Sequence, residues 1–153
     1  MDIRRADRVD LPSILQLQYL AYRSEAEILN DFTIPPLRET LGELFAQYDQ
    51  GDLFLKIEKE DGALIGSIRG RFEQGTLFIG KLMVHPDWRG KGLGGRLLAH
   101  IQALFPTCRY ELFTSSESRK NIALYQRSGF RIFQEKTIKP GLTFLYLEKY
   151  SGK

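Results

Sequence analysis

The residues best suited to chemistry in this chain lie in one stretch, residues 84–98, where glycines alternate with cations. The glycines are Gly90, Gly92, Gly94 and Gly95, and the cations are Arg89, Lys91 and Arg96. Backbone N–H groups at the start of a helix are unpaired and lie at the positive end of the helix dipole, and glycines leave them open to an anion. The stretch therefore predicts a phosphate-binding loop. The alternative is a glycine-rich connector with a solvated basic face.

Two flanking segments must position this loop. Residues 77–84 are mostly apolar and predict a strand, which Pro86 ends because proline cannot donate a ladder hydrogen bond. After the glycines the apolar residues recur at helical spacing; they are Leu93, Leu97, Leu98, Ile101, Leu104 and Phe105. A helix is therefore expected to begin within the glycines.

The loop resembles a family signature. Arg89-x-x-Gly92-x-Gly94 is similar to the pyrophosphate signature of the GNAT superfamily of acetyl-coenzyme A dependent N-acetyltransferases. Three further segments resemble that family in the same order: residues 3–17 its first strand and helix, residues 84–86 the end of its fourth strand, and residues 124–130 a late Leu-Tyr and Gly-Phe motif. The resemblance extends over about residues 3–147.

The resemblance implies acetyl-coenzyme A as cosubstrate, with no metal, and direct attack of an amine on the thioester. The implied cofactor-binding residues are the backbone of Leu82, Met83 and Val84 at the oxyanion, and Arg89, Gly90, Lys91, Gly92, Leu93, Gly94, Gly95 and Arg96 at the pyrophosphate. Ser118 and Asn121 stand where many relatives have an asparagine and a small residue. Ser118 is expected to cap a helix, and Asn121 to contact the pantetheine amides.

Acetyl transfer needs a proton donor for the thiolate and a proton acceptor for the ammonium group. Tyr125 matches the family tyrosine and is the expected donor; the alternative is an ordinary buried aromatic residue. Many relatives carry a carboxylate on the fourth strand, but residues 76–86 have none, and Phe78 and Lys81 stand there instead. Glu111 is the expected substitute as a base if it faces the site, or a structural residue if it pairs with Arg109.

The acceptor pocket of the family would fall on residues Tyr22, Glu25, Asp31 and Phe32. These acids could attract a cationic amine, and the aromatic side chains would make its entrance partly apolar. The alternative is a loop of solvated charges. The acceptor itself stays open between a small amine, an amino acid, a polyamine and a protein amino group.

The hydrophobic periods predict one α/β domain over residues 1–153, with a mixed, mostly antiparallel sheet of about seven strands flanked by about four helices. Strands are expected at 2–6, 53–59, 63–73, 76–85, 109–114, 130–138 and 142–149, and further helices from Asp10, at 37–48 and at 118–128. Residues 24–35 are expected to form a loop. The composition, 42% hydrophobic and 27% charged, suits a single core.

Other features limit the functional classes. The chain has one cysteine, Cys108, and a net charge of +3, so neither a thiolate metal site nor nucleic-acid binding is indicated. No apolar run is long enough for a membrane helix and no signal-peptide pattern begins the chain, so a cytoplasmic location is expected. Homodimerisation, which is common in similar proteins, stays open.

Three alternatives to an enzyme of this family stay open. Gly90-x-Gly92-x-x-Gly95 also fits a dinucleotide-binding fingerprint, but an antiparallel meander before it does not suit that fold. A non-catalytic acyl-coenzyme A sensor could use the same loop, and the missing fourth-strand carboxylate is compatible with it. A nucleic-acid binder would show steep salt dependence.

Overall fold

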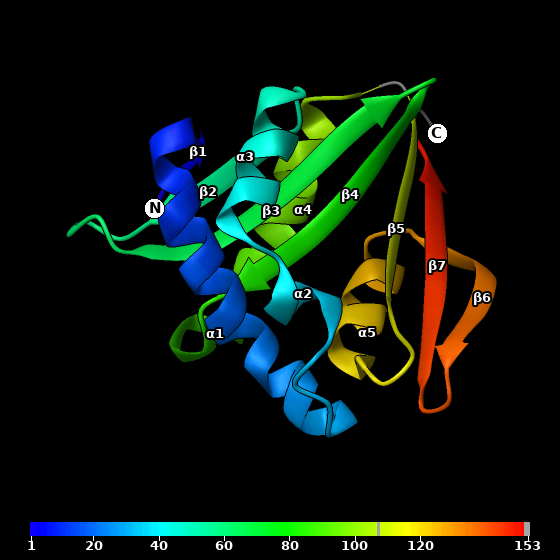
Figure 1. The fold of residues 1–153 in the computed structure, drawn as a ribbon. Helices are drawn as coiled ribbons and strands as arrows, with labels where there is room; N and C mark the ends of the chain where they lie inside the picture. The colour runs from blue at the N-terminus through cyan, green and yellow to red at the C-terminus, as the bar shows by residue number, and fades with distance from the viewer. Residues whose placement is uncertain (107, 152–153) are drawn as a thin grey trace.

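A seven-stranded sheet with helices on both faces forms the frame of the protein (Figure 1). The computed structural model describes residues 1–106 and 108–151. The strands are β1 (Ile3–Arg5), β2 (Leu53–Glu58), β3 (Leu64–Glu73), β4 (Thr76–Val84), β5 (Arg109–Ser115), β6 (Arg131–Lys139) and β7 (Leu142–Tyr150). The helices are α1 (Leu11–Leu29), α2 (Pro35–Arg38), α3 (Leu41–Asp49), α4 (Leu93–Ala103) and α5 (Arg119–Arg127), with short 3-10 turns at Arg8–Asp10 and Pro86–Trp88.

The sheet order is β1-β2-β3-β4-β5-β7-β6, and all neighbours are antiparallel except β4 and β5. This confirms the expected α/β fold with a mixed, mostly antiparallel sheet. The parallel pair is short: it joins only residues 76–78 to residues 109–111. Beyond Phe78 the two strands separate, and Figure 1 shows them diverging from one end of the sheet. The opening between β4 and β5 is called the splay below.

A β-bulge lies in β4 beside the splay. Ser67 pairs with Met83 and Arg69 pairs with Gly80, so β4 has one more residue than β3 over this interval. Lys81 lies within the bulge and has a φ of 48°. Residues other than glycine adopt this left-handed conformation at a cost, and such strain is held in place by surrounding structure.

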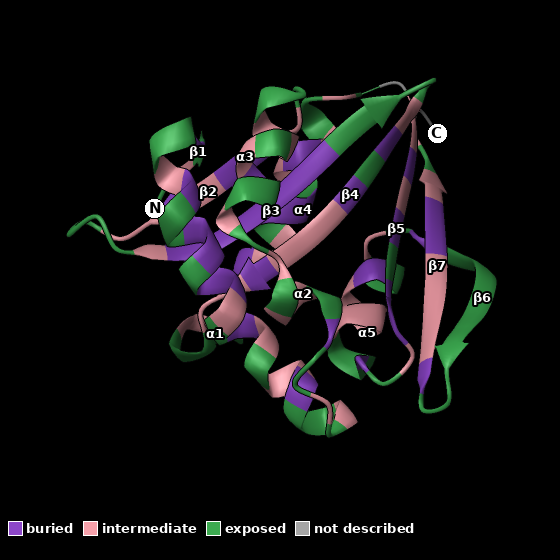
Figure 2. Ribbon diagram, viewed as in Figure 1, coloured by how far each residue is buried: buried purple, intermediate pink, exposed green. Residues whose placement is uncertain are grey.

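The two faces of the sheet carry separate cores. On one face α4 packs with its periodic apolar residues, including Leu97, Leu98 and Ile101, against alternate residues of the central strands. On the other face α1 and α3 pack against Phe54. Figure 2 shows the buried stripe along α1 and the exposed residues along β6, the edge strand.

The expected loop at residues 24–35 is wrong for its first half, because α1 continues to Leu29. The segment 24–29 contains no glycine or proline, and Ala26 is buried, so tertiary packing extends the helix. The helix ends at Asn30, which has a left-handed φ of 50°. This extension carries Glu25 on a helix rather than on a mobile connector.

The expected helix at 37–48 is divided in two. Glu39 is extended and ends α2, and Thr40 then caps α3 by accepting a hydrogen bond from the Glu43 N–H. The Glu43 carboxylate in turn accepts from the Thr40 N–H at 2.8 Å, which completes a capping box. Glu39 lies between α2 and α3, and its carboxylate accepts hydrogen bonds from Gln18 of α1 and Gln47 of α3.

Candidate active site

The glycine loop starts α4 with an open helix end. Gly92 is the N-cap residue of α4, with a φ of 81°, and Gly90 has a φ of 76°. Both conformations favour glycine. A Cβ at Gly94 would lie 3.4 Å from Cδ2 of Leu124, an ordinary van der Waals contact, so α4 and α5 pack side by side at this position. The first-turn N–H groups of α4 thus lie at an end suited to an anion.

Two of the loop arginines bond to the N-terminal part of the chain. Arg89 donates to Ser24 Oγ at 3.0 Å and to the Ala21 carbonyl at 2.8 Å. Arg96 donates to the Met1 carbonyl at 2.7 Å. Arg89 therefore ties the loop to α1, and its side chain has a structural role in addition to the expected one. A contact of either arginine with phosphate stays a prediction.

A cavity of about 160 Å³ lies in the splay. Its lining comes from α1, the segment 34–36, β4, β5, α5 and β7. The lining residues are Tyr22, Glu25, Leu29, Ile34, Pro35, Pro36, Ile79, Gly80, Lys81, Leu82, Leu112, Phe113, Thr114, Ser115, Asn121, Tyr125, Leu142 and Phe144. The structure thus brings five of the predicted site residues outside the loop to one place, and they are Tyr22, Glu25, Leu82, Asn121 and Tyr125.

Tyr125 lines this cavity from α5 and is only 6% exposed. Burial raises the pKa of Tyr125 above the usual tyrosine value, and the nearby Tyr22 and Glu25 raise it further. Burial raises the pKa of Tyr22 in the same way. Both phenols therefore stay protonated at neutral pH, which is the state that a proton donor needs.

Glu25 lines the cavity from α1 and accepts a hydrogen bond from the Ser118 hydroxyl. Burial raises the pKa of Glu25, and the bond from Ser118 opposes that rise. Ser118 occupies the N-cap position of α5, but its hydroxyl makes no capping bond. The expected N-cap position of Ser118 is confirmed, but its side chain does not make the capping bond and instead joins α5 to Glu25.

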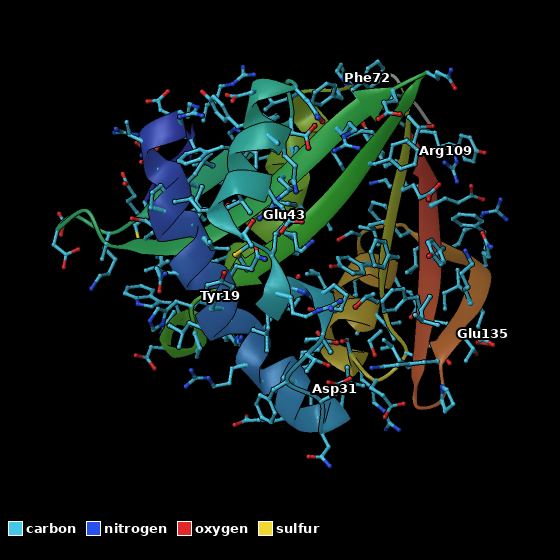
Figure 3. The ribbon with its side chains drawn as sticks, viewed as in Figure 1. Tyr19, Asp31, Glu43, Phe72, Arg109 and Glu135 are labelled. Carbon is cyan, nitrogen blue, oxygen red and sulfur yellow. The ribbon has the colours of Figure 1, made fainter. Side chains whose placement is uncertain are left out.

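Glu111 takes the second of its two expected arrangements. Arg109 donates to Glu111 at 2.8 Å and to Glu148 at 2.9 Å. These residues lie at the paired end of β5, where Figure 3 labels Arg109, and Glu111 is opposite Phe78, the last paired residue of β4. Glu111 does not line the cavity. Its ion pair with Arg109 and its position outside the cavity lining favour the structural role over the role of base.

Asp31 and Phe32 lie outside the cavity lining. Asp31 accepts hydrogen bonds from Lys139 at 2.6 Å and from Thr33, and the bond from Lys139 is the largest cause that lowers the pKa of Asp31. Phe32 is 56% exposed. Figure 3 shows Asp31 at the far end of α1. An acceptor role for this pair stays a prediction that the cavity geometry does not support.

Lys81 lines the cavity, although sequence patterns assign it no role beyond replacing a carboxylate. Its neighbour under the cavity is a buried polar network of Gln18, Glu39 and Arg69. Arg69 is 5% exposed, and an arginine between Ile68 and Gly70 in the middle of β3 is a sequence signal that could have revealed the network. The bulge that turns Lys81 toward the cavity has no sequence signature.

The comparisons with known proteins agree with this arrangement. The model of the acetyltransferase (GNAT) family matches residues 15–130, which include the glycine loop and Tyr125, and the chain belongs to this family. The family resemblance seen in the sequence is thereby confirmed. A curated relative is the UPF0157 protein YqkA of Bacillus subtilis, 32% identical over 119 residues. That match covers 77% of this chain, and the chain spans about a third (34%) of the length of YqkA.

Solved structures share the fold. The ribosomal-protein-S18-alanine N-acetyltransferase of Escherichia coli has a TM-score of 0.81 at 16% identity, covering 99% of this chain and 95% of that chain. The PaiA N-acetyltransferase of Thermoplasma acidophilum, in complex with coenzyme A, has a TM-score of 0.78 at 16% identity, covering 97% and 98%. YncA of Salmonella typhimurium, with acetyl-coenzyme A, has a TM-score of 0.77 at 22% identity, covering 100% and 95%.

Over residues 1–106 and 108–151, no group of three His, Cys, Asp or Glu side chains is arranged to hold a metal ion. In the same part of the chain, no helix is both long and apolar enough to cross a membrane.

Proposed function

We propose that the protein is an N-acetyltransferase that transfers the acetyl group of acetyl-coenzyme A to a primary amine. The observation that carries the proposal is the cavity in the splay, which is lined by Tyr125 and Glu25 and lies beside the bulged strand that leads to the glycine loop. Membership of the acetyltransferase family supports it, as do fold relatives whose structures contain coenzyme A or acetyl-coenzyme A.

The described residues fit this cosubstrate. The open N-terminus of α4, with Gly92 at its N-cap, would bind the pyrophosphate through backbone N–H groups. The cavity wall of Leu82 and Asn121 would border the pantetheine arm, which ends in the thioester. Backbone N–H groups of residues 82–84, just past the bulge, would donate to the carbonyl oxygen of that thioester as negative charge develops on it.

The proposed reaction is direct transfer. The amine nitrogen forms a bond to the acetyl carbon, the carbon–sulfur bond breaks, and the thiolate takes a proton from the Tyr125 hydroxyl. The amine must lose a proton, because alkyl ammonium groups are the main form at neutral pH. Among the described residues, Glu25 is the carboxylate that lines the cavity, so it is the group we assign to the amine, in place of Glu111.

The cofactor half of the proposal is tested by calorimetric titration with acetyl-coenzyme A. We expect Gly92→Glu to weaken binding by about tenfold or more, because it places a carboxylate at the proposed pyrophosphate site. Gly75→Glu is a matched control, since Gly75 has the same φ of 81° and open space around its Cβ position, but lies in the turn between β3 and β4, at the opposite end of β4 from the glycine loop. No binding by the wild type, or equal weakening by both variants, would contradict the proposed site.

A further inference from the structure

The buried Arg69 and the partly buried Lys81 share one carboxylate at the cavity. Glu39 lies 3.3 Å from the Arg69 guanidinium and 3.9 Å from the Lys81 ammonium. The same carboxylate accepts hydrogen bonds from Gln18 at 2.8 Å and from Gln47 at 2.6 Å. Glu39 is therefore already surrounded by donors, and its bond to Lys81 is the longest of the set.

The other acids near this cluster are engaged elsewhere. Asp52 accepts two hydrogen bonds from Arg71, at 3.0 and 3.2 Å. Glu43 accepts from Thr40 in the capping box of α3. Within ion-pair distance, Arg69 and Lys81 thus share the one carboxylate of Glu39, and Glu43 attracts Lys81 only from farther away. A partly buried cation without a close counter-ion is costly, so an anion supplied from the cavity side would stabilise it.

Lys81 is the member of this cluster that lines the cavity. The bulge holds it there in a left-handed conformation, with a φ of 48°. Its side chain is 26% exposed, whereas that of Arg69 is 6% exposed. Burial lowers the pKa of Lys81, the attraction of Glu39 opposes this, and Arg69 adds to the lowering. Lys81 is therefore a cation that a ligand can reach and whose surroundings favour a new anionic partner.

The opposite charge lies on another wall. Glu25 lines the cavity from α1, where it is bonded to Ser118, and it forms no ion pair with Lys81. Much of the remaining lining is apolar, including Leu29, Ile34 and Leu142. A cavity with separate anionic and cationic positions in apolar walls is complementary to a molecule that carries both charges on an apolar body.

We propose that the acetyl acceptor is a small, partly apolar amine that also carries a carboxylate, such as an apolar amino acid, with Lys81 binding the carboxylate and Glu25 facing the amine. This inference rests on the proposed acetyl transfer. The phosphates of the cosubstrate are assigned to α4, so they do not supply the anion for Lys81. The lysine in β4 then sets acceptor specificity at a position where many relatives carry a carboxylate.

The test compares acceptors that differ only in charge. L-leucine, leucinamide and 3-methylbutylamine are titrated calorimetrically into protein saturated with coenzyme A, and the same series is repeated for valine, methionine and phenylalanine. We expect at least one acid to bind about tenfold or more tightly than its amide and its decarboxylated amine, because a charge-assisted bond to Lys81 is lost in both. Thiol release from acetyl-coenzyme A is measured with the same compounds.

Lys81→Met should abolish the preference for the acid, whereas Lys81→Arg should keep it. Lys136→Met, on exposed β6, is the control for losing one positive charge. Thermal unfolding of each variant shows whether it is folded. If Lys81→Met does not fold, the acid preference is tested in Lys81→Arg. The inference fails if no acid in the panel binds more tightly than its amide, or if the preference survives in Lys81→Met. If an acid binds in a Lys81-dependent way but no compound releases thiol, the proposed transfer fails and the binding specificity stands.

Discussion

The two ends of the proposed site are built from different parts of the chain. The cofactor end consists of backbone N–H groups from one continuous stretch, the end of β4 and the start of α4. The acceptor end consists of side chains such as Tyr22, Lys81 and Tyr125, brought together from separate elements around the splay. A site made of backbone N–H groups needs only glycines and the start of a helix. It can therefore stay the same while a site made of side chains changes its specificity one residue at a time.

This contrast suggests where substitutions separate binding from chemistry. Changes in the glycine loop should affect the cosubstrate, whereas changes around the splay should affect turnover and acceptor choice. The side chains under the splay are also part of the fold, because Glu39 and Arg69 join α1, α3 and β3 through hydrogen bonds. Stability and specificity are therefore coupled at the acceptor end.

Tyr125→Phe is expected to have the largest effect. Removing a general acid should lower kcat by about 10²- to 10⁴-fold while the affinity for acetyl-coenzyme A stays unchanged. The measurement is thiol release in the steady state together with calorimetric binding. Tyr150→Phe is the control, because Tyr150 is 58% exposed at the end of β7. Unchanged turnover in Tyr125→Phe would remove this hydroxyl from the mechanism.

Glu39→Gln should lower the free energy of unfolding by about 3 kcal/mol, because it leaves the buried Arg69 and the partly buried Lys81 without their shared carboxylate. Urea denaturation followed by circular dichroism measures the free energy of unfolding. Glu117→Gln is the control, because Glu117 is exposed. Adding Lys81→Met to Glu39→Gln should restore part of the loss, since one of the two cations is then gone. A double variant no more stable than Glu39→Gln would argue against an unpaired charge on Lys81 as a cause of the loss.

The same contrast explains what could be predicted from the sequence. Glycine spacing and hydrophobic periodicity are local patterns, set by residues close together in the sequence. They therefore predicted the glycine loop, the start of α4 and most of the strands. The splay depends on how far β4 and β5 pair, and the exposure of Lys81 depends on a bulge; neither is encoded by local pattern. Glu111 shows the same limit, because the strand pattern could not decide between the site and the Arg109 ion pair. The length of α1 depended on tertiary burial of Ala26.

Glu25→Gln should lower kcat/KM by about tenfold or more and change its pH dependence. In the wild type, kcat/KM should fall as pH decreases through the pKa of Glu25, which burial raises above the usual glutamate value. This acidic limb should be missing in Glu25→Gln. Glu27→Gln is the matched control, because Glu27 is on the same helix, is exposed and does not line the cavity. A limb that persists in Glu25→Gln would assign the proton transfer to another group.

Glu25→Gln should lose activity without losing stability. A carboxyl group whose pKa is higher in the folded than in the unfolded state favours folding when it is protonated, and this contribution is lost as pH rises through the folded pKa. Glu25→Gln is therefore expected to be at least as stable as the wild type at neutral pH. Urea denaturation at neutral and mildly acidic pH checks it. A clear loss of stability at neutral pH would mean that the bond to Ser118 outweighs the effect of burial.

Glu111→Gln should have the smallest effect on the reaction. Arg109 keeps its bond to Glu148, and the side chain of Glu111 is 21% exposed, so the free energy of unfolding should fall by no more than about 1 kcal/mol. Turnover and its acidic limb should stay within about twofold of the wild type, because Glu111 does not line the cavity. Steady-state kinetics of Glu111→Gln beside Glu25→Gln decides between the two carboxylates. A large loss in the first with none in the second would move the proton acceptor from α1 to β5.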